Sequence, residues 1–290
     1  MSGATRSQVT VLGLGAMGRA LAGSLLAEPA NTVTVWNRTP GRDADLVARG
    51  ARPATSVRDA VTAGPLVIVC LYDHASVHAT LDPVADHLRG RTVVNLTTGT
   101  PNEARELATW AERHGIDYLD GAIMAIPSMI GTPEAAILYS GSQPAFEEHR
   151  QVLDAWATST YEDADAGRAS LLDLAMLSAM YTMFAGFLHG AAMVTADGVS
   201  AREFAARATP FLAAMTSAFE ADAEIVDSGS YATDGQTLDW SDLSHLVRVS
   251  EEQGVDPAPI AMVEQLRRRQ VDAGHGGDAF ARIYESLRRT

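Results

Sequence analysis

The first half of the chain alternates short apolar runs with amphipathic stretches. The apolar runs are QVTVLGLG (8–15), TVTVWNR (32–38), PLVIVCL (65–71), RTVVNLT (91–97) and IDYLDGAI (116–123). Helical patterns such as AMGRALAGSLLAE and PNEARELATWAERHG separate them. Strands that are apolar along most of their length, each followed by a helix, predict a doubly wound, Rossmann-type α/β fold with a parallel sheet covered on both faces.

The second half of the chain loses the strand pattern after about Arg168. The stretch SLLDLAMLSAMYTMFAGFLHGAAM (170–193) is apolar on all sides and predicts one long helix, and further helical patterns follow it. We therefore expect an α/β domain over residues 1–165, an inter-domain helix over 166–196, and an all-helical domain over 197–290.

A glycine turn follows the first predicted strand and opens the first predicted helix. Gly13, Gly15 and Gly18 form the pattern GxGxxG in this context. The first glycine permits a tight turn, the second lets a pyrophosphate approach the backbone, and the third lets helix and strand pack closely. The whole turn, which includes Leu14, Ala16 and Met17, is expected to bind a dinucleotide.

The end of the second predicted strand selects the nucleotide. NAD-binding proteins usually carry a carboxylate there, whereas this chain has Asn37, Arg38 and Thr39, with Arg42 close behind. Arg38 can pair with a 2′-phosphate, which predicts NADP(H) as the cofactor. The alternative is that Arg38 is a solvated loop residue. Leu71, at the end of the next apolar run, is expected to line the same site.

Composition narrows the possible functions. The net charge of −14 argues against nucleic acid and anionic membrane surfaces as partners. The single cysteine excludes an intrachain disulfide and a cysteine-rich metal site, and no metal is expected. The first residues contain no hydrophobic signal core, so we expect a cytoplasmic protein. Asp173, Tyr181 and His189 argue against a membrane span over the long apolar helix.

The chain contains no lysine, since all 22 of its basic residues are arginine. It therefore cannot form a Schiff base through a lysine or use an ammonium group as a general acid.

The segments VLGLGAMG, WNRT, VVNLTTGTP, DGAIMAIP and ASLLDLAMLSAMY occur in this order over nearly the whole chain. Together they resemble the β-hydroxyacid dehydrogenase superfamily, and within it the imine reductase and reductive aminase branch. The resemblance implies an NADPH-dependent oxidoreductase that reduces C=N bonds of cyclic imines or iminium ions, and it leaves open the coupling of ketones to small amines.

The resemblance also implies the catalytic residues. Hydroxyacid dehydrogenases carry a catalytic lysine on the inter-domain helix, whereas imine reductases present Asp or Tyr there. Asp173 occupies the aspartate position, and Tyr181 follows it by the eight residues typical of reductive aminases. Asn95 and Thr97 stand where the hydroxyacid enzymes have an acidic residue and a serine, and are expected to position substrate or nicotinamide. The apolar segment GAIMAIPSMIG replaces a carboxylate-binding loop and indicates an apolar substrate.

The family resemblance further implies a domain-swapped homodimer, in which each active site lies between the α/β domain of one chain and the helices of the other.

Helix geometry allows Asp173 and Tyr181 to act at the same site. Eight helical residues separate two side chains by about 80° and ~12 Å, so Asp173 and Tyr181 can face one cleft without touching each other.

Purely structural roles remain open for three of these residues. Asp173 could support a helix N-terminus, Tyr181 could be a core residue, and Asn95 could merely end a strand. Two other functions also remain open. One is a β-hydroxyacid or aldehyde reductase of the same superfamily, and the other is an NADP-binding protein without turnover.

Overall fold

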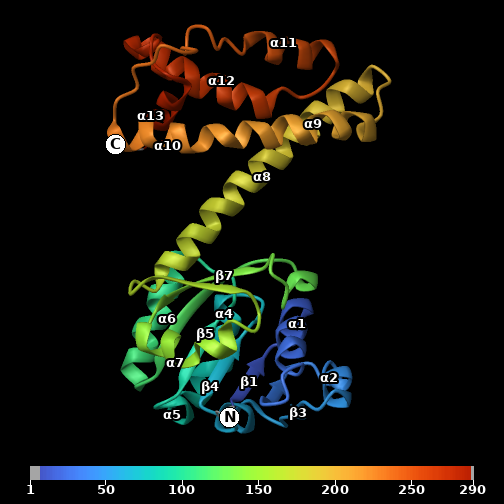
Figure 1. Cartoon of the computed structure of the whole chain (residues 1–290), viewed down its shortest axis with the longest axis vertical. Coiled ribbons are helices and arrows are strands. Elements are labelled where there is room, and N and C mark those ends of the chain that lie inside the picture. The colour runs from blue at the N-terminus through green and yellow to red at the C-terminus, as the bar shows by residue number, and fades with distance from the viewer. Residues whose placement is uncertain (1–6, 289–290) are drawn as a thin grey trace. The chain divides into compact units, whose positions relative to one another are not determined.

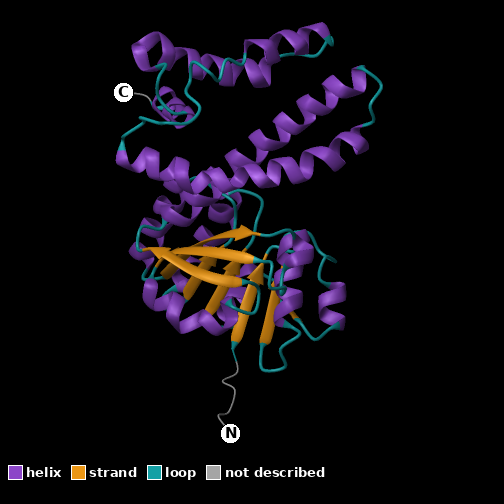
Figure 2. Ribbon diagram, turned by 45° about the horizontal axis from the view of Figure 1, so that its top comes forward, coloured by secondary structure: helices purple, strands orange, loops and turns teal. Residues whose placement is uncertain are grey.

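The computed structural model describes residues 7–288, and its first part is built on one eight-stranded sheet (Figures 1 and 2). The strands lie in the order β3-β2-β1-β4-β5-β6-β7-β8. Their bounds are β1 Gln8–Leu12, β2 Thr32–Trp36, β3 Arg52–Pro53, β4 Leu66–Val69, β5 Thr92–Asn95, β6 Asp117–Met124, β7 Ala136–Gly141 and β8 Thr158–Asp163.

The predicted doubly wound parallel sheet is confirmed from β3 to β6, where all neighbouring strands run parallel. The strand order reverses between β1 and β4. Loops that leave neighbouring strands at such a switch point diverge to opposite faces of the sheet, and the crevice between them is where dinucleotides bind. The glycine turn follows β1 directly.

Helices cover both faces of the sheet because the strands are apolar on both sides. Helices α1 (Ala16–Leu25), α2 (Ala44–Ala48) and α7 (Gln143–Leu153) pack on one face. Helices α3 (Val57–Thr62), α4 (His74–Leu81), α5 (Ala85–Leu88) and α6 (Pro101–His114) pack on the other. Two separate apolar clusters result, one on each face.

The sheet departs from a fully parallel arrangement at β7, which pairs antiparallel with β6. The connection between them contains only the short 3₁₀ turn η2 (Pro127–Met129). A parallel return would need a crossover of a dozen or more residues, usually a helix, so this chain folds back antiparallel. Strands β3, β7 and β8 were not predicted from the apolar pattern.

The long helix predicted after Arg168 is confirmed as α8 (Gly167–Ala196). The chain divides into two compact units within this helix, between Leu177 and Ser178. The second unit contains further helices, as the pattern predicts: α9 (Ala201–Met215), α10 (Phe219–Ser228), α11 (Ser244–Glu252), α12 (Ala258–Gln270) and α13 (Tyr284–Leu287).

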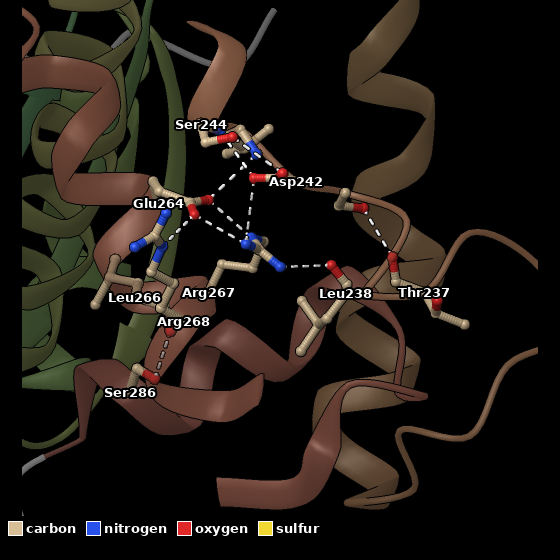
Figure 3. A network of polar contacts seen from close by, with 11 residues as sticks. Thr237, Leu238, Asp242, Ser244, Glu264, Leu266, Arg267, Arg268 and Ser286 are labelled. Carbon is tan, nitrogen blue, oxygen red and sulfur yellow. Dashed lines mark hydrogen bonds and ion pairs between the residues drawn. The ribbon is translucent and has the colours of Figure 1, made fainter. Parts of the chain in front are cut away.

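A buried ion pair ties together the helices and loops of the second unit (Figure 3). The Arg267 guanidinium donates two hydrogen bonds of 2.8 Å to the Glu264 carboxylate, and a third of 2.9 Å to the carbonyl of Leu238. The hydrogen bonds from Arg267 lower the pKa of Glu264 to about 2. Both side chains are less than a tenth exposed. Removing either one would leave the other as a buried charge without this partner, which is energetically unfavourable.

Candidate active site

The glycine turn adopts the conformation that its three glycines predict. Gly13 has φ +97°, and a Cβ there would run into the backbone carbonyl of Cys70. A Cβ on Gly18 would meet the carbonyl of Gly13, since helix and turn are in close contact. Gly15 is different, because a Cβ built on it meets no protein atom within 4 Å. The absence of a side chain at Gly15 therefore keeps open a space in front of the turn.

This space lies at the N-terminus of α1. Gly15 is the N-cap residue, with no side-chain cap and no acidic residue in the first turn of the helix. Free N–H groups and the helix dipole make such an end favourable for phosphate. Asn37 braces the turn, because its Oδ1 accepts a hydrogen bond of 2.9 Å from the Leu14 N–H and its Nδ2 donates one of 2.9 Å to the Thr39 carbonyl.

A cavity of about 540 Å³ opens in front of this helix end. It is lined by most of the predicted cofactor residues, namely Gly13, Gly15, Ala16, Met17, Gly18, Asn37, Arg38, Thr39, Arg42 and Leu71. It is also lined by five residues that were not predicted, Trp36, Cys70, Tyr72, Ser76 and Thr80. Trp36, Cys70 and Tyr72 could have been found from the rule that ligands bind at the carboxyl ends of parallel strands.

The lining of this cavity contains two arginines and no carboxylate. Arg19 supports the backbone of Arg42. It donates a hydrogen bond of 3.0 Å to the Arg42 carbonyl and forms an ion pair of 2.9 Å with Asp45. The residues therefore fit a dinucleotide with a phosphate on its adenosine ribose, in agreement with the choice of NADP(H) from the sequence.

Replacing Arg38 by alanine is expected to weaken NADPH binding by about 10- to 100-fold, the equivalent of one charge-assisted hydrogen bond. The affinity for NADH should change little, because NADH lacks the 2′-phosphate. Titrating both nucleotides into each protein by calorimetry measures the two effects. Arg58→Ala, an exposed arginine outside the cavity, is the matched control for lost net charge. Equal losses for NADPH and NADH would contradict the role of Arg38.

Asn95 and Thr97 lie outside this cavity, in a buried chain of hydrogen bonds beside it. The Leu71 N–H donates to Thr97 Oγ1 at 3.0 Å, and the Thr97 N–H donates to Asn95 Oδ1 at 3.2 Å. Asn95 Nδ2 in turn donates to the Tyr118 hydroxyl at 3.3 Å. Asn95 and Thr97 therefore fix the backbone of Leu71, which lines the cavity. Leu14, also predicted to bind cofactor, is fully buried.

Asp120 ends this hydrogen-bond chain and was not singled out from the sequence. The Tyr118 hydroxyl donates to its Oδ1 at 3.3 Å, and the Ser170 hydroxyl donates to its Oδ2 at 2.5 Å. Burial raises the pKa of Asp120 to about 6, and the hydrogen bonds from Ser170 and Tyr118 oppose this shift. The negative charge of Asp173 adds to the increase. The charge of Asp173, in α8, therefore reaches the carboxyl of Asp120, in β6.

The raised pKa of Asp120 predicts a pH-dependent loss of stability. The unfolded chain releases this proton near pH 3.8 and the folded protein near pH 6, so the folded state binds more protons in between. The free energy of unfolding should fall by on the order of 3 kcal/mol as pH rises from about 4 to about 6, relative to Asp120→Asn. Urea unfolding of both proteins across this range tests the prediction. A difference that stays constant with pH would contradict it.

Asp173 lies in the second turn of α8, which begins at Gly167, so it does not cap the helix. The residue is 7% exposed, and within residues 7–288 the structure records no hydrogen bond or ion pair to its carboxyl group. Burial alone raises its pKa. The carboxyl oxygens of Asp173 are not among the fully buried polar atoms that lack a partner, so they reach the surface of this chain. A carboxyl that is accessible, unpaired among the described residues and raised in pKa is available to a ligand, so Asp173 has the character of a functional group.

Tyr181 belongs to the second compact unit and is 65% exposed, so it is not a core tyrosine of this chain. Its ring makes an edge contact with Phe184 at 6.4 Å between centroids. Ile126, in the apolar segment after β6, is likewise 61% exposed. Both are large apolar surfaces available for contact with a ligand or with another chain.

The fold and the cavity define a dinucleotide-binding protein with a Rossmann-type domain. Residues 8–164 match the model of the NAD binding domain of 6-phosphogluconate dehydrogenase, and residues 165–289 match that of the C-terminal domain of NADPH-dependent reductive aminase-like proteins.

Proteins of known identity point the same way. The NADPH-dependent reductive aminase of Aspergillus oryzae is 40% identical over 283 residues, which are 96% of each chain. The reductive aminase of Aspergillus terreus, solved in complex with NADPH4, cyclohexanone and allyl amine, superimposes with a TM-score of 0.91 at 41% identity, over 98% of this chain and 100% of that one. The imine reductase of Myxococcus stipitatus, in complex with NADP+, gives 0.91 at 37% identity, over 97% and 100%.

This chain belongs to the imine reductase and reductive aminase family, as its motifs predicted.

Proposed function

We propose that the protein is an NADPH-dependent imine reductase that reduces the C=N bond of cyclic imines or iminium ions and couples ketones to small amines. The observation that carries the proposal is Asp173, a largely buried residue whose carboxyl has no hydrogen-bond or ion-pair partner among residues 7–288, in a chain that has no lysine. The relatives that act with NADPH, and the one solved with a ketone and an amine, support it.

The role of Asp173 follows from its charge. The cofactor, when bound, supplies a hydride to carbon, and the nitrogen of the substrate must then be cationic or gain a proton. A carboxylate stabilises an iminium cation by Coulomb attraction, whereas a lysine ammonium would repel it. Burial raises the pKa of Asp173, which also favours the protonated form needed to donate a proton.

We assign supporting roles to the other two predicted residues. Asn95 holds the loop around Leu71 through Thr97, and so positions the lining of the cofactor cavity. Tyr181, with its exposed hydroxyl, orients the substrate or the attacking amine. The exposed Ile126 and the apolar segment around it favour an apolar substrate.

We further propose that the protein acts as a homodimer with active sites shared between subunits. By length and mean hydropathy, α8 could cross a membrane, yet it carries Asp173, Tyr181 and His189. The second compact unit also exposes large apolar side chains, namely Tyr181, Met183, Phe184, Leu188, Phe211, Met215 and Phe219. A surface of this kind is better covered by a second protein chain than by water.

A mixed dimer tests the shared site. Gly15→Ala disables the cofactor side of a site and Tyr181→Phe disables the helical side. If each site combines the two sides from different chains, a heterodimer of these variants contains one intact site. At an NADPH concentration too low to occupy Gly15→Ala, unfolding and refolding the two impaired proteins together should therefore raise activity above that of either variant alone, by up to about a quarter of the parental rate for random pairing of subunits. Mixtures that stay as inactive as the separate variants would contradict the proposal.

The proposed activity is tested by NADPH consumption with three substrate sets. These are 2-methylpyrroline, a ketone with a small amine, and glyoxylate or succinic semialdehyde. We expect turnover of the first two sets. Turnover of the aldehydes alone would identify a hydroxyacid or aldehyde reductase, and tight NADPH binding without turnover would identify a non-catalytic protein. We further propose that the enzyme is located in the cytoplasm.

A further inference from the structure

Two histidines and a glutamate come together on the face of the sheet covered by α4 and α6. His74 and His78 are one helical turn apart on α4, and Glu106 projects from α6. The Glu106 Oε2 lies 3.2 Å from His74 Nε2 and 2.8 Å from His78 Nε2. One potential ligand atom from each residue lies within 4.8 Å of the other two. We propose that this cluster is a binding site for a zinc-like divalent cation that joins α4 to α6.

The three side chains have the chemistry of a zinc site. Two imidazoles and one carboxylate, with a fourth position for water, are a ligand set that zinc adopts in proteins. Tetrahedral ligands at about 2.0–2.1 Å from the metal lie ~3.3 Å from each other. The distances to Glu106 are close to this value, while the ligand atoms of the whole cluster lie within 4.8 Å of one another, so the side chains must turn toward a common centre to bind the ion. The histidine side chains are about a quarter exposed, which leaves a path for entry.

Asp82 provides a second, independent indication of a metal site. Its Oδ1 lies 2.9 Å from His78 Nδ1, the ring nitrogen opposite to the proposed ligand atom. A carboxylate in this position orients the ring and favours a proton on Nδ1, so that Nε2, which is hydrogen-bonded to Glu106 in this structure, can bind a metal in place of that hydrogen bond. The nearly buried Trp110 ring lies edge-on to the His78 ring, with 6.1 Å between the ring centroids, and limits the movement of the histidine.

His74 presents its Nε2 to Glu106 but lacks the supporting partner that His78 has. Its Nδ1 is buried and has no hydrogen-bond partner among residues 7–288. The nitrogen that can reach solvent or a ligand is therefore the one directed into the cluster.

The position of the cluster gives the cation a structural role. Ser76 and Thr80, which alternate with the histidines along α4, line the cofactor cavity. Helix α6 follows strand β5, which ends at Asn95, and the loop that contains Thr97. A cation bound by all three ligands would hold together the two segments that follow β4 and β5, next to the cofactor.

Zinc titration of untagged protein, stripped with EDTA, tests this proposal without any assay of activity. We expect one Zn²⁺ per chain by calorimetry, a higher melting temperature with zinc, and a four-coordinate visible spectrum with Co²⁺. His78→Ala and Glu106→Gln should abolish the site, and Asp82→Asn should weaken it by about 10- to 100-fold.

His87→Ala, on the neighbouring helix α5 and outside the cluster, is the matched control and should bind zinc like the parent. This control matters because a net charge of −14 attracts cations everywhere on the surface. Binding that is unchanged in His78→Ala and Glu106→Gln would overturn the proposal, as would the absence of stoichiometric binding to the parent protein.

Discussion

Replacing Asp173 by asparagine is expected to lower kcat for imine reduction by about 10²- to 10⁴-fold, the contribution typical of a positioned general acid or base. Asparagine keeps the size of the side chain but can neither carry a negative charge nor release a proton at neutral pH. The nitrogen of the substrate would then lose both its counter-charge and its proton source. Steady-state rates of NADPH consumption with 2-methylpyrroline measure the loss.

The same variant should bind NADPH with its original affinity, because Asp173 does not line the cofactor cavity. Asp163→Asn, at a partly exposed aspartate that ends β8 shortly before α8, is the matched control for removing one charge near this helix. Its activity should remain close to that of the parent. Comparable rates in Asp173→Asn and the parent would remove Asp173 from the mechanism, whatever the substrate.

Replacing Gly15 by alanine is expected to weaken NADPH binding by about a hundredfold, ~2.7 kcal/mol, with little change in stability. Gly15 has φ −67° and ψ −175°, a conformation that alanine adopts without strain. The new methyl group would meet no protein atom, but it would fill the space at the N-terminus of α1 where we place the pyrophosphate. Binding titrations and urea unfolding separate the two effects.

Gly13→Ala is the contrasting variant in the same turn. Its φ of +97° is unfavourable for alanine, and its Cβ would collide with the carbonyl of Cys70. We expect this change to destabilise the folded protein by about 1–3 kcal/mol in addition to impairing binding. A Gly15→Ala protein that binds NADPH as tightly as the parent would show that the nucleotide does not approach the turn at this point.

The sequence alone determined the features that depend on neighbouring residues. The apolar runs predicted β1, β2, β4, β5 and β6, because a strand covered on both faces must be apolar along its length. The glycine spacing predicted the turn, since only glycine avoids the contacts at Gly13 and Gly18. The absence of a carboxylate after β2 predicted the cofactor. Each of these signals lies within a few consecutive positions.

The cofactor residues were predicted from sequence signals of the same local kind. Ten of the thirteen predicted cofactor residues line one cavity, because loops from the carboxyl ends of β1, β2 and β4 meet at the switch point of the sheet. The other three do not line the cavity but support the residues that do; they are Leu14, Asn95 and Thr97. Which residues face the ligand and which brace them depends on side-chain direction, which the spacing does not reveal.

Only the tertiary structure decided the arrangements that join distant segments. β7 runs antiparallel because no crossover helix precedes it. Asp120 acquires its raised pKa from burial beside Ser170, fifty residues away along the chain. Glu106 reaches His74 and His78 because α4 and α6 pack on the same face of the sheet. Burial and proximity arise only when the chain is folded, so no short pattern of residues encodes them.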